Sequence, residues 1–441
     1  MTVVEHGSSL DALTAIDGDA DSLPTWRRAR REQGLAALAE AGLPQRRDEP
    51  WHYFPTAKLT DLLDGAVAPR SAGALDPGQV DIMAGDLGCS RLVFVNGFHD
   101  VGASRLSPSD GVTVSALSAV ADSDSADHTG PPSPSTASGR TDGTVALNAA
   151  AAVDGAMISV SAEATEATIH VVHVAVPDAD KTYGIFPHTL ISLAPGATAT
   201  VVESFIGFRG PALVDSVTTI DLAEGSRLAY HRLQSEGRST VHLGRVDAVI
   251  GAGADLTTTS VSLGAELSRT AFDVTLAGDE SSVTLDGLYL PRSGQHLDHT
   301  LTVQHSANRT TSEQRFKGVV DDDGRGSFTG HVIVDPDTAG TTAHQSNHNI
   351  LLSSRAEADT RPWLEILADD VRCTHGATVG RLDDEAVFYL RSRGIPEATA
   401  REMLIEGFAG EIIDGIDLEP LRDHLRSRIT SSRKPTATTR G

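Results

Sequence analysis

The chain has 441 residues, and its 60 acidic and 36 basic side chains give a formal net charge of −24. This excess of negative charge argues against nucleic acid, or an anionic membrane surface, as the main partner. Because two cysteines are too few for a disulfide framework, and neither an apolar signal core nor ~18 uninterrupted apolar residues appears, we expect a cytoplasmic protein.

The N-terminal part predicts a helix followed by less regular structure. In residues 23–44, "LPTWRRARREQGLAALAEAGLP", apolar side chains recur at helical spacing, and the pattern ends at Gly42. Residues 47–59, "RDEPWHYFPTAKL", place three aromatic side chains between two prolines, which predicts an ordered extended segment rather than a helix. Residues 91–100 predict a strand followed by a turn.

The middle of the chain changes character and predicts a β-rich core. Runs of about 5 to 9 residues, rich in β-branched side chains, recur between Gly, Asp, Asn and Ser turns. A sandwich, a propeller and a solenoid are all compatible with such runs. No clean self-match at 20–50 residues appears. A degenerate parallel β-helix fits best, because each coil needs only short strands and tolerant corners.

Helical spacing returns after residue 382. Asp383 or Asp384 is a suitable N-cap for a helix that Gly394 ends, and a second helix with an apolar stripe follows Pro396. The stripe consists of Leu404, Phe408 and Ile412. We therefore divide the chain into a helical or mixed region 1–120, a flexible polar linker 121–143, a β-helix core 144–382, a C-terminal helical region 383–430 and a disordered tail 431–441.

Residues 304–390 contain a long series of ordered motifs. Among them are "HSANRTTSEQRFKG", "FTGHVIV", "NILLS", "ADTRPWLEILADDVRCTHGATVG" and "FYLRSRGI", and the segment "EPWHYFPTAKL" adds a looser match. The series closely resembles the SufB/SufD family of iron–sulfur cluster assembly scaffold proteins. The resemblance is to the SufD branch of the family, because Gly376 follows "RCTH" and no cysteine lies between Cys89 and Cys373.

The resemblance implies a right-handed parallel β-helix flanked by helical regions. It further implies a heterodimer with a SufB-like subunit through the β-helices, and a SufC-like ABC ATPase docked on the C-terminal helices. A transient iron–sulfur cluster would form at the interface between the two scaffold subunits, and the presence of a reduced flavin in the complex stays open. Within this chain, the resemblance assigns a cluster ligand to His375, while the role of the matching Cys373 is less certain.

Geometry alone supports a shared donor face at these two residues. Positions i and i+2 of a strand point to the same face, so the thiol of Cys373 and the imidazole of His375 can meet one metal ion or one edge of a cluster. Two ligands do not complete a cluster, so a second chain must supply the rest. The competing interpretation is a buried cysteine beside a hydrogen-bonded histidine. For Cys89 we favour that structural role.

Other histidines, and other chemistries, are less favoured. We expect six histidines to be solvated or hydrogen-bonded rather than metal ligands: His296, His299, His305, His331, His344 and His348. No P-loop, G-x-S-x-G, H-E-x-x-H or C-x-x-C motif occurs, so we expect no ATP site in this chain and no enzymatic activity. Two alternatives to the cluster scaffold stay open, namely a hetero-oligomerisation module without a metal role and a polysaccharide-active β-helix enzyme. The net charge opposes the enzyme.

Overall fold

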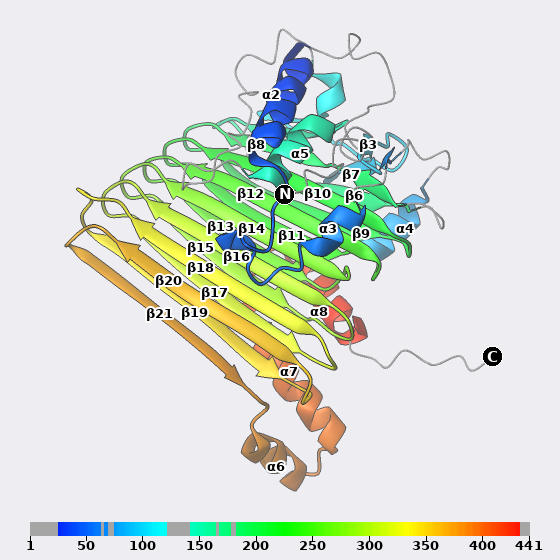
Figure 1. Ribbon diagram of the computed structural model, residues 1–441, viewed down its shortest axis with the longest axis vertical. Coiled ribbons are helices and arrows are strands. Elements are labelled where there is room, and N and C mark those ends of the chain that lie inside the picture. Colours follow the sequence, from blue (N-terminus) through cyan, green and yellow to red (C-terminus); the bar gives the residue numbers. More distant parts are fainter. Residues whose placement is uncertain are drawn as a thin grey trace, which may run out of the picture.

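The computed structural model describes residues 25–62, 66–68, 75–120, 142–164, 167–177 and 182–432. Most strands form two sheets that face each other and wind as a parallel β-solenoid of about 8 turns (Figure 1). From β8 onward, successive strands alternate between the two sheets, so that even-numbered strands share one sheet and odd-numbered strands the other. The predicted parallel β-helix is therefore confirmed, and the sandwich and the propeller are excluded.

The first sheet runs from β20 at one end to β4 at the other. Its strands are β20 (Glu357–Ile366), β18 (Arg325–Val334), β16 (His296–His305), β14 (Leu267–Leu276), β12 (Thr240–Ile250), β10 (Ala212–Leu222), β8 (His188–Leu193), β5 (Gly155–Val160) and β4 (Val112–Ala116), with β7 (Tyr183–Ile185) and β1 (Ala66–Val67) beside β10. All of its pairings are parallel except that of β4 with β5.

The second sheet runs from β21 at the same end to β3. Its strands are β21 (Val371–Gly380), β19 (Thr341–Leu351), β17 (Thr311–Val320), β15 (Ser282–Tyr289), β13 (Asp255–Ser262), β11 (Arg227–Ser235), β9 (Thr198–Gly207), β6 (Ala167–Ala175), β2 (Ser90–Val95) and β3 (Phe98–His99). Only β2 and β3 pair antiparallel. Since β2 and β4 precede residue 121, the N-terminal region also contributes strands to the solenoid.

A left-handed backbone turn recurs at one corner of the coils. Its residues with positive φ are Gly196, Gly225, Gly253, Glu280, Arg309 and Gly340. The backbone N–H of each donates to a carbonyl of the next coil, as Gly253 does to Asp279 at 2.9 Å. Side-chain bonds between neighbouring coils join residues from 27 apart, as in Ser282 to Asp255, to 34 apart, as in Arg325 to Asp359. This variable coil length explains why the sequence shows no clean repeat.

Glycines inside the solenoid make room for large aromatic side chains. A Cβ atom on Gly287 would lie 2.0 Å from Cε1 of Phe316, and one on Gly318 would lie 2.4 Å from Cε2 of Tyr289. Both aromatic side chains are buried in the main apolar cluster between the sheets. Each glycine therefore makes room for the aromatic side chain of its register partner on the neighbouring strand.

We expect Gly287→Ala to lower the free energy of unfolding by about 1–3 kcal/mol, because the added methyl group overpacks the interior against Phe316. Urea unfolding of the isolated chain measures the change. Gly380→Ala is the matched control, since nothing lies within 4 Å of a Cβ atom at that strand position. Equal stability of the two variants would contradict this account of the packing.

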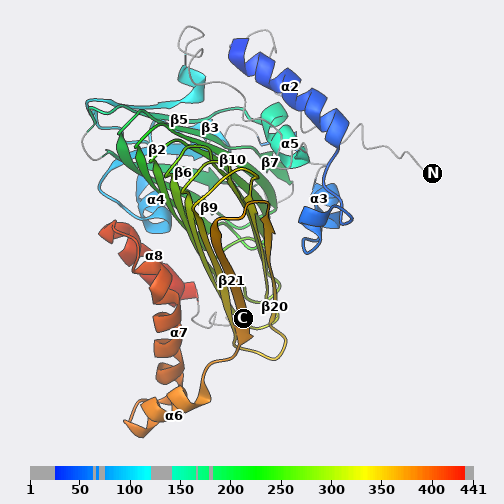
Figure 2. The ribbon, with the colours of Figure 1, turned by 90° about the vertical axis from the view of Figure 1, so that its left-hand side faces the viewer.

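Helices cover the outer faces of both sheets (Figure 2). On the first sheet, α2 (Thr25–Ala41) and α5 (Gly143–Ala151) share an apolar cluster with outward-facing side chains of β10, β12 and β14. On the second sheet, α4 (Pro77–Ala84), α7 (Glu397–Ile413) and α8 (Glu419–Ser432) pack against outward-facing side chains of β2, β6, β9, β11, β13, β15 and β17. The remaining helical segments are η2 (Glu49–Trp51), α3 (Ala57–Leu62), η3 (Leu117–Ala119) and α6 (Asp384–Ser392).

Several local predictions are confirmed and one is wrong. The helix predicted before Gly42 is α2, and Asp383 caps α6 by accepting from the Glu385 backbone N–H. The segment 47–59 is not extended, since it forms η2 and the start of α3, with a proline at the start of η2 where a missing N–H is tolerated. Of the expected linker and tail, residues 121–141 and 433–441 lie outside the described part of the chain.

Within that described part, none of the helices combines the length and the apolar character needed to cross a bilayer.

Candidate functional site

His375 and Cys373 lie on β21, the last strand of the second sheet. Among the described strands, β21 pairs only with β19, and β20 pairs only with β18. The terminal coil therefore has unpaired strand edges on both sheets, and we call this end of the solenoid the open end (Figure 1). The predicted site lies at a surface that a second chain can reach, rather than deep within the coils.

Cys373 is half-buried at the open end. In register it pairs with Ala343, and it packs beside an apolar cluster that includes Val332 and Val334. Burial raises the pKa of the Cys373 thiol, and a hydrogen bond with the Ala343 backbone opposes this only in part. The thiol is therefore protonated at neutral pH, and a metal would have to displace the proton before the sulfur could act as a ligand.

His375 is exposed, although it lies on the same inward-facing side of β21 as Cys373. Its register partner is Gln345 on β19, which is buried between the sheets. No further coil covers the imidazole within the described structure. The shared face predicted for positions 373 and 375 is thus present, with one donor embedded in apolar side chains and the other open to solvent.

The open end does not complete a metal site by itself. In residues 25–432, apart from the undescribed gaps, no group of three or more His, Cys, Asp or Glu side chains is placed to hold a metal ion. Cys89 cannot join Cys373, because it immediately precedes β2, near the opposite end of the same sheet. Burial raises the pKa of the Cys89 thiol to about 11, in keeping with the structural role predicted for it.

The six other histidines singled out from the sequence have partners within the chain, as predicted. Three bond buried hydroxyl groups, His296 that of Ser327, His299 that of Ser262 and His305 those of Thr310 and Ser312. His331 stacks on Trp363 and pairs with Glu365. On the outer face, His344 and His348 hold the terminal strand, since their Nδ1 atoms bond the hydroxyl groups of Thr374 and Thr378 on β21.

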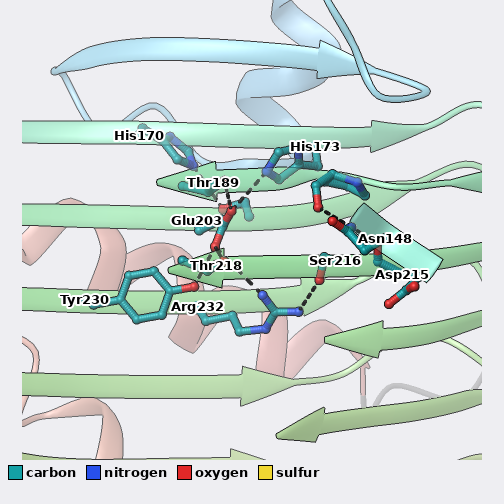
Figure 3. A network of polar contacts seen from close by, with 12 residues as sticks. Asn148, His170, His173, Thr189, Glu203, Asp215, Ser216, Thr218, Tyr230 and Arg232 are labelled. Atoms are coloured by element: carbon teal, nitrogen blue, oxygen red, sulfur yellow. Dashed lines mark hydrogen bonds and ion pairs between the residues drawn. The ribbon is translucent and has the colours of Figure 1, made fainter. Parts of the chain in front are cut away.

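A buried polar network inside the solenoid was not predicted from the sequence (Figure 3). Its centre is Glu203, whose carboxylate accepts hydrogen bonds from Thr189, Thr218 and Tyr230 and contacts His173 at 3.0 Å. Burial alone would raise the pKa of Glu203, but His173 and the other partners hold it at about 2. The carboxylate is therefore ionised in the protein interior.

Arg232 extends this network across the solenoid. Its guanidinium lies 3.8 Å from the Glu203 carboxylate, donates to the Ser216 hydroxyl and stacks 3.9 Å over the Phe205 ring. It also contacts Nε2 of His242, whose Nδ1 bonds Glu236. Because arginine only donates, Nε2 of His242 accepts and Nδ1–H donates to Glu236, which makes this histidine neutral.

The C-terminal helix α6 presents large exposed side chains away from the solenoid. It follows β21 directly in the chain and leads into α7, and it lies below the strands in Figure 2. Phe388 is 70% exposed and Tyr389 is 58% exposed, whereas only Val387 of this helix is buried. Adjacent exposed aromatic side chains of this kind are typical of a surface that another protein covers.

Comparisons with known proteins point to one family. Residues 175–408 match the family model described as SUF system FeS cluster assembly, SufBD core domain. The chain is 31% identical to the iron–sulfur cluster assembly protein SufD of Escherichia coli over 426 residues, which cover 92% of this chain and 93% of that protein. It is 29% identical to the SufBD family protein slr0076 of Synechocystis, covering 96% and 94% of the two chains. A SufBD family protein of Mycobacterium leprae, ML0594, is 33% identical over 58% of this chain and 67% of its own length.

Proposed function

Because the chain belongs to the SufBD family of iron–sulfur cluster assembly proteins, we propose that it is the SufD-like subunit of a SUF scaffold complex in the cytoplasm. The observation that carries the proposal is the position of His375 and Cys373 on the terminal strand of an open solenoid end. In this role the chain positions donors and partners for a nascent cluster, and it is not itself an enzyme.

The open end would supply only part of the cluster's ligands. Imidazole nitrogen is a suitable ligand for iron, so the exposed side chain of His375 is the ligand we assign to it. Cys373 would follow as a second donor once iron displaces its proton. A SufB-like subunit docked on the open end would provide the remaining ligands, because the described residues hold no complete set.

Two exposed surfaces suggest the two partners. The unpaired edges of β20 and β21 suit a second β-solenoid, since edge strands accept a further strand through backbone hydrogen bonds. The aromatic surface of α6 suits a SufC-like ATPase. That subunit would bind and hydrolyse ATP, because this chain contains no P-loop. A reduced flavin would provide electrons within the complex, and we assign it no residue of this chain.

The experiment is co-expression of the chain with SufB-like and SufC-like partners, followed by size-exclusion chromatography. We expect one stable complex that contains all three proteins. Phe388→Ala with Tyr389→Ala should weaken ATPase binding by about 2 kcal/mol or more, as for exposed aromatic anchors, while the SufB-like partner stays bound. Met403→Ala, which removes another exposed apolar side chain, from α7, is the control.

Two outcomes would oppose the proposal. If the three proteins do not associate, the proposal that this chain is a subunit of a SUF scaffold complex is wrong. If they associate but no iron–sulfur cluster forms on the complex under anaerobic conditions with iron and sulfide, the hetero-oligomerisation module without a metal role becomes the better account.

A further inference from the structure

Three polar side chains stack in register towards the open end. Gln314 on β17 pairs with Gln345 on β19, and Gln345 pairs with His375 on β21. The strands are parallel and about 4.8 Å apart, so these side chains lie one above another on the inward-facing side. His375 is the last rung of this ladder, and it is the only one of the three that is exposed.

The two lower rungs are already joined and buried. Nε2 of Gln345 donates to Oε1 of Gln314 at 2.6 Å, and the Gln345 side chain is only 3% exposed. Gly330 on the facing sheet gives this amide its space, since a Cβ atom there would lie 2.1 Å from Nε2 of Gln345. Yet Oε1 of Gln345 is a buried acceptor without a hydrogen-bond partner in the described part of the chain.

A buried amide oxygen without a partner is costly, and the next rung can satisfy it. We propose that a ring N–H of His375 donates to Oε1 of Gln345, so that the other ring nitrogen presents its lone pair away from the solenoid, towards the open end. Gln345 is thus a positioning residue for His375. Histidines that bind metals commonly donate their second N–H to such an acceptor, which fixes the tautomer and the direction of the lone pair.

The consequence for cluster binding rests on the proposed function, but the hydrogen bond itself requires neither metal nor partner. It can therefore be tested on the isolated chain by NMR of 15N-labelled histidine side chains. The His375 signals are those lost in His375→Ala. We expect a single imidazole tautomer at position 375 in the wild-type chain. A mixture of both tautomers, as in a free imidazole, would overturn the inference whether or not any variant folds.

Variants test whether Gln345 is the cause. Gln345→Leu replaces the acceptor with an apolar side chain of similar size, so both tautomers of His375 should appear. Gln345→Glu retains an acceptor oxygen and should restore one tautomer. Thr341→Val is the matched control, because Thr341 is buried on the same strand but pairs with Val371. A single tautomer that persists in Gln345→Leu would show that another group orients the ring.

Chemical modification tests the direction of the proposed hydrogen bond between His375 and Gln345. Diethyl pyrocarbonate acylates the unprotonated ring nitrogen, so His375 should react as fast as the exposed His52. Much slower reaction would mean that the lone pair points inward to the Gln345 amide N–H, contrary to the inference.

In the reconstituted complex, Gln345→Leu should lower the cluster yield about 10-fold, less than loss of His375 itself. If His375→Ala leaves the yield unchanged while the single tautomer is observed, the proposed function fails and the hydrogen bond stands.

Discussion

His375→Ala is expected to lower the yield of iron–sulfur cluster on the reconstituted complex at least about 100-fold. Loss of an outer-sphere partner of a metal ligand already costs 10- to 100-fold, and removal of the ligand should cost no less. The chain should still fold, since the imidazole is exposed and its loss removes at most the proposed hydrogen bond to the buried Gln345 amide oxygen, worth about 1–3 kcal/mol. Absorption spectra of the anaerobic complex, with iron and sulfide analysis, measure the yield.

His344→Ala is the appropriate control for this substitution. It removes a second exposed imidazole beside the same terminal strand, but one that bonds Thr374 on the outer face. We expect its cluster yield to match the wild type. Cys373→Ser should have the smaller effect of the two site substitutions, because the thiol is half-buried among apolar side chains and protonated. Wild-type yield from His375→Ala, with the complex intact, would favour a purely structural role for this chain.

The shared face of Cys373 and His375 could be predicted from the sequence, because the quoted motif places the two residues two positions apart in an expected strand. The inward face of β19 could not, because buried and more exposed positions alternate along this strand while buried residues such as Gln345 and Asn347 are polar. The parallel β-helix was preferred on different grounds, because its coils need only short strands and tolerant corners. The sequence does not show which coil is the last, since nothing in the residues of β21 indicates that no further strand pairs with it.

The polar network around Glu203 could not be predicted, and the reason is physical. Helices cover the outer face of β9, so Val202 and Ile206 are buried against them while Glu203 and Phe205 are buried between the sheets. A strand buried on both faces loses the alternation that separates inside from outside. The predicted stripe of α7 packs on the solenoid, but it is not the most buried side of the helix. Ile412 is buried and Leu404 and Phe408 are partly buried, whereas Ile405 and Ala409 are buried one position after them.

Glu203→Ala is expected to lower the free energy of unfolding by about 3–5 kcal/mol, the largest stability effect we predict. The substitution leaves the buried guanidinium of Arg232 without its nearest carboxylate, and it deprives His173 and Tyr230 of their acceptor. Urea unfolding at neutral pH measures the change. Arg426→Ala, which breaks an ion pair between half-exposed side chains, should cost no more than about 1 kcal/mol.

The contribution of Glu203 should also depend on pH in a defined direction. Its pKa is about 2 in the folded chain and 4.5 when unperturbed, so the unfolded state binds a proton first as the pH falls. The stability that ionisation adds, about 3 kcal/mol, is fully present above pH 4.5 and disappears as the pH falls towards 2. The difference in stability between the wild type and Glu203→Gln should therefore shrink over this range. A difference that stays constant from pH 7 to pH 3 would mean that Glu203 stabilises the solenoid through packing and neutral hydrogen bonds, and not through its charge.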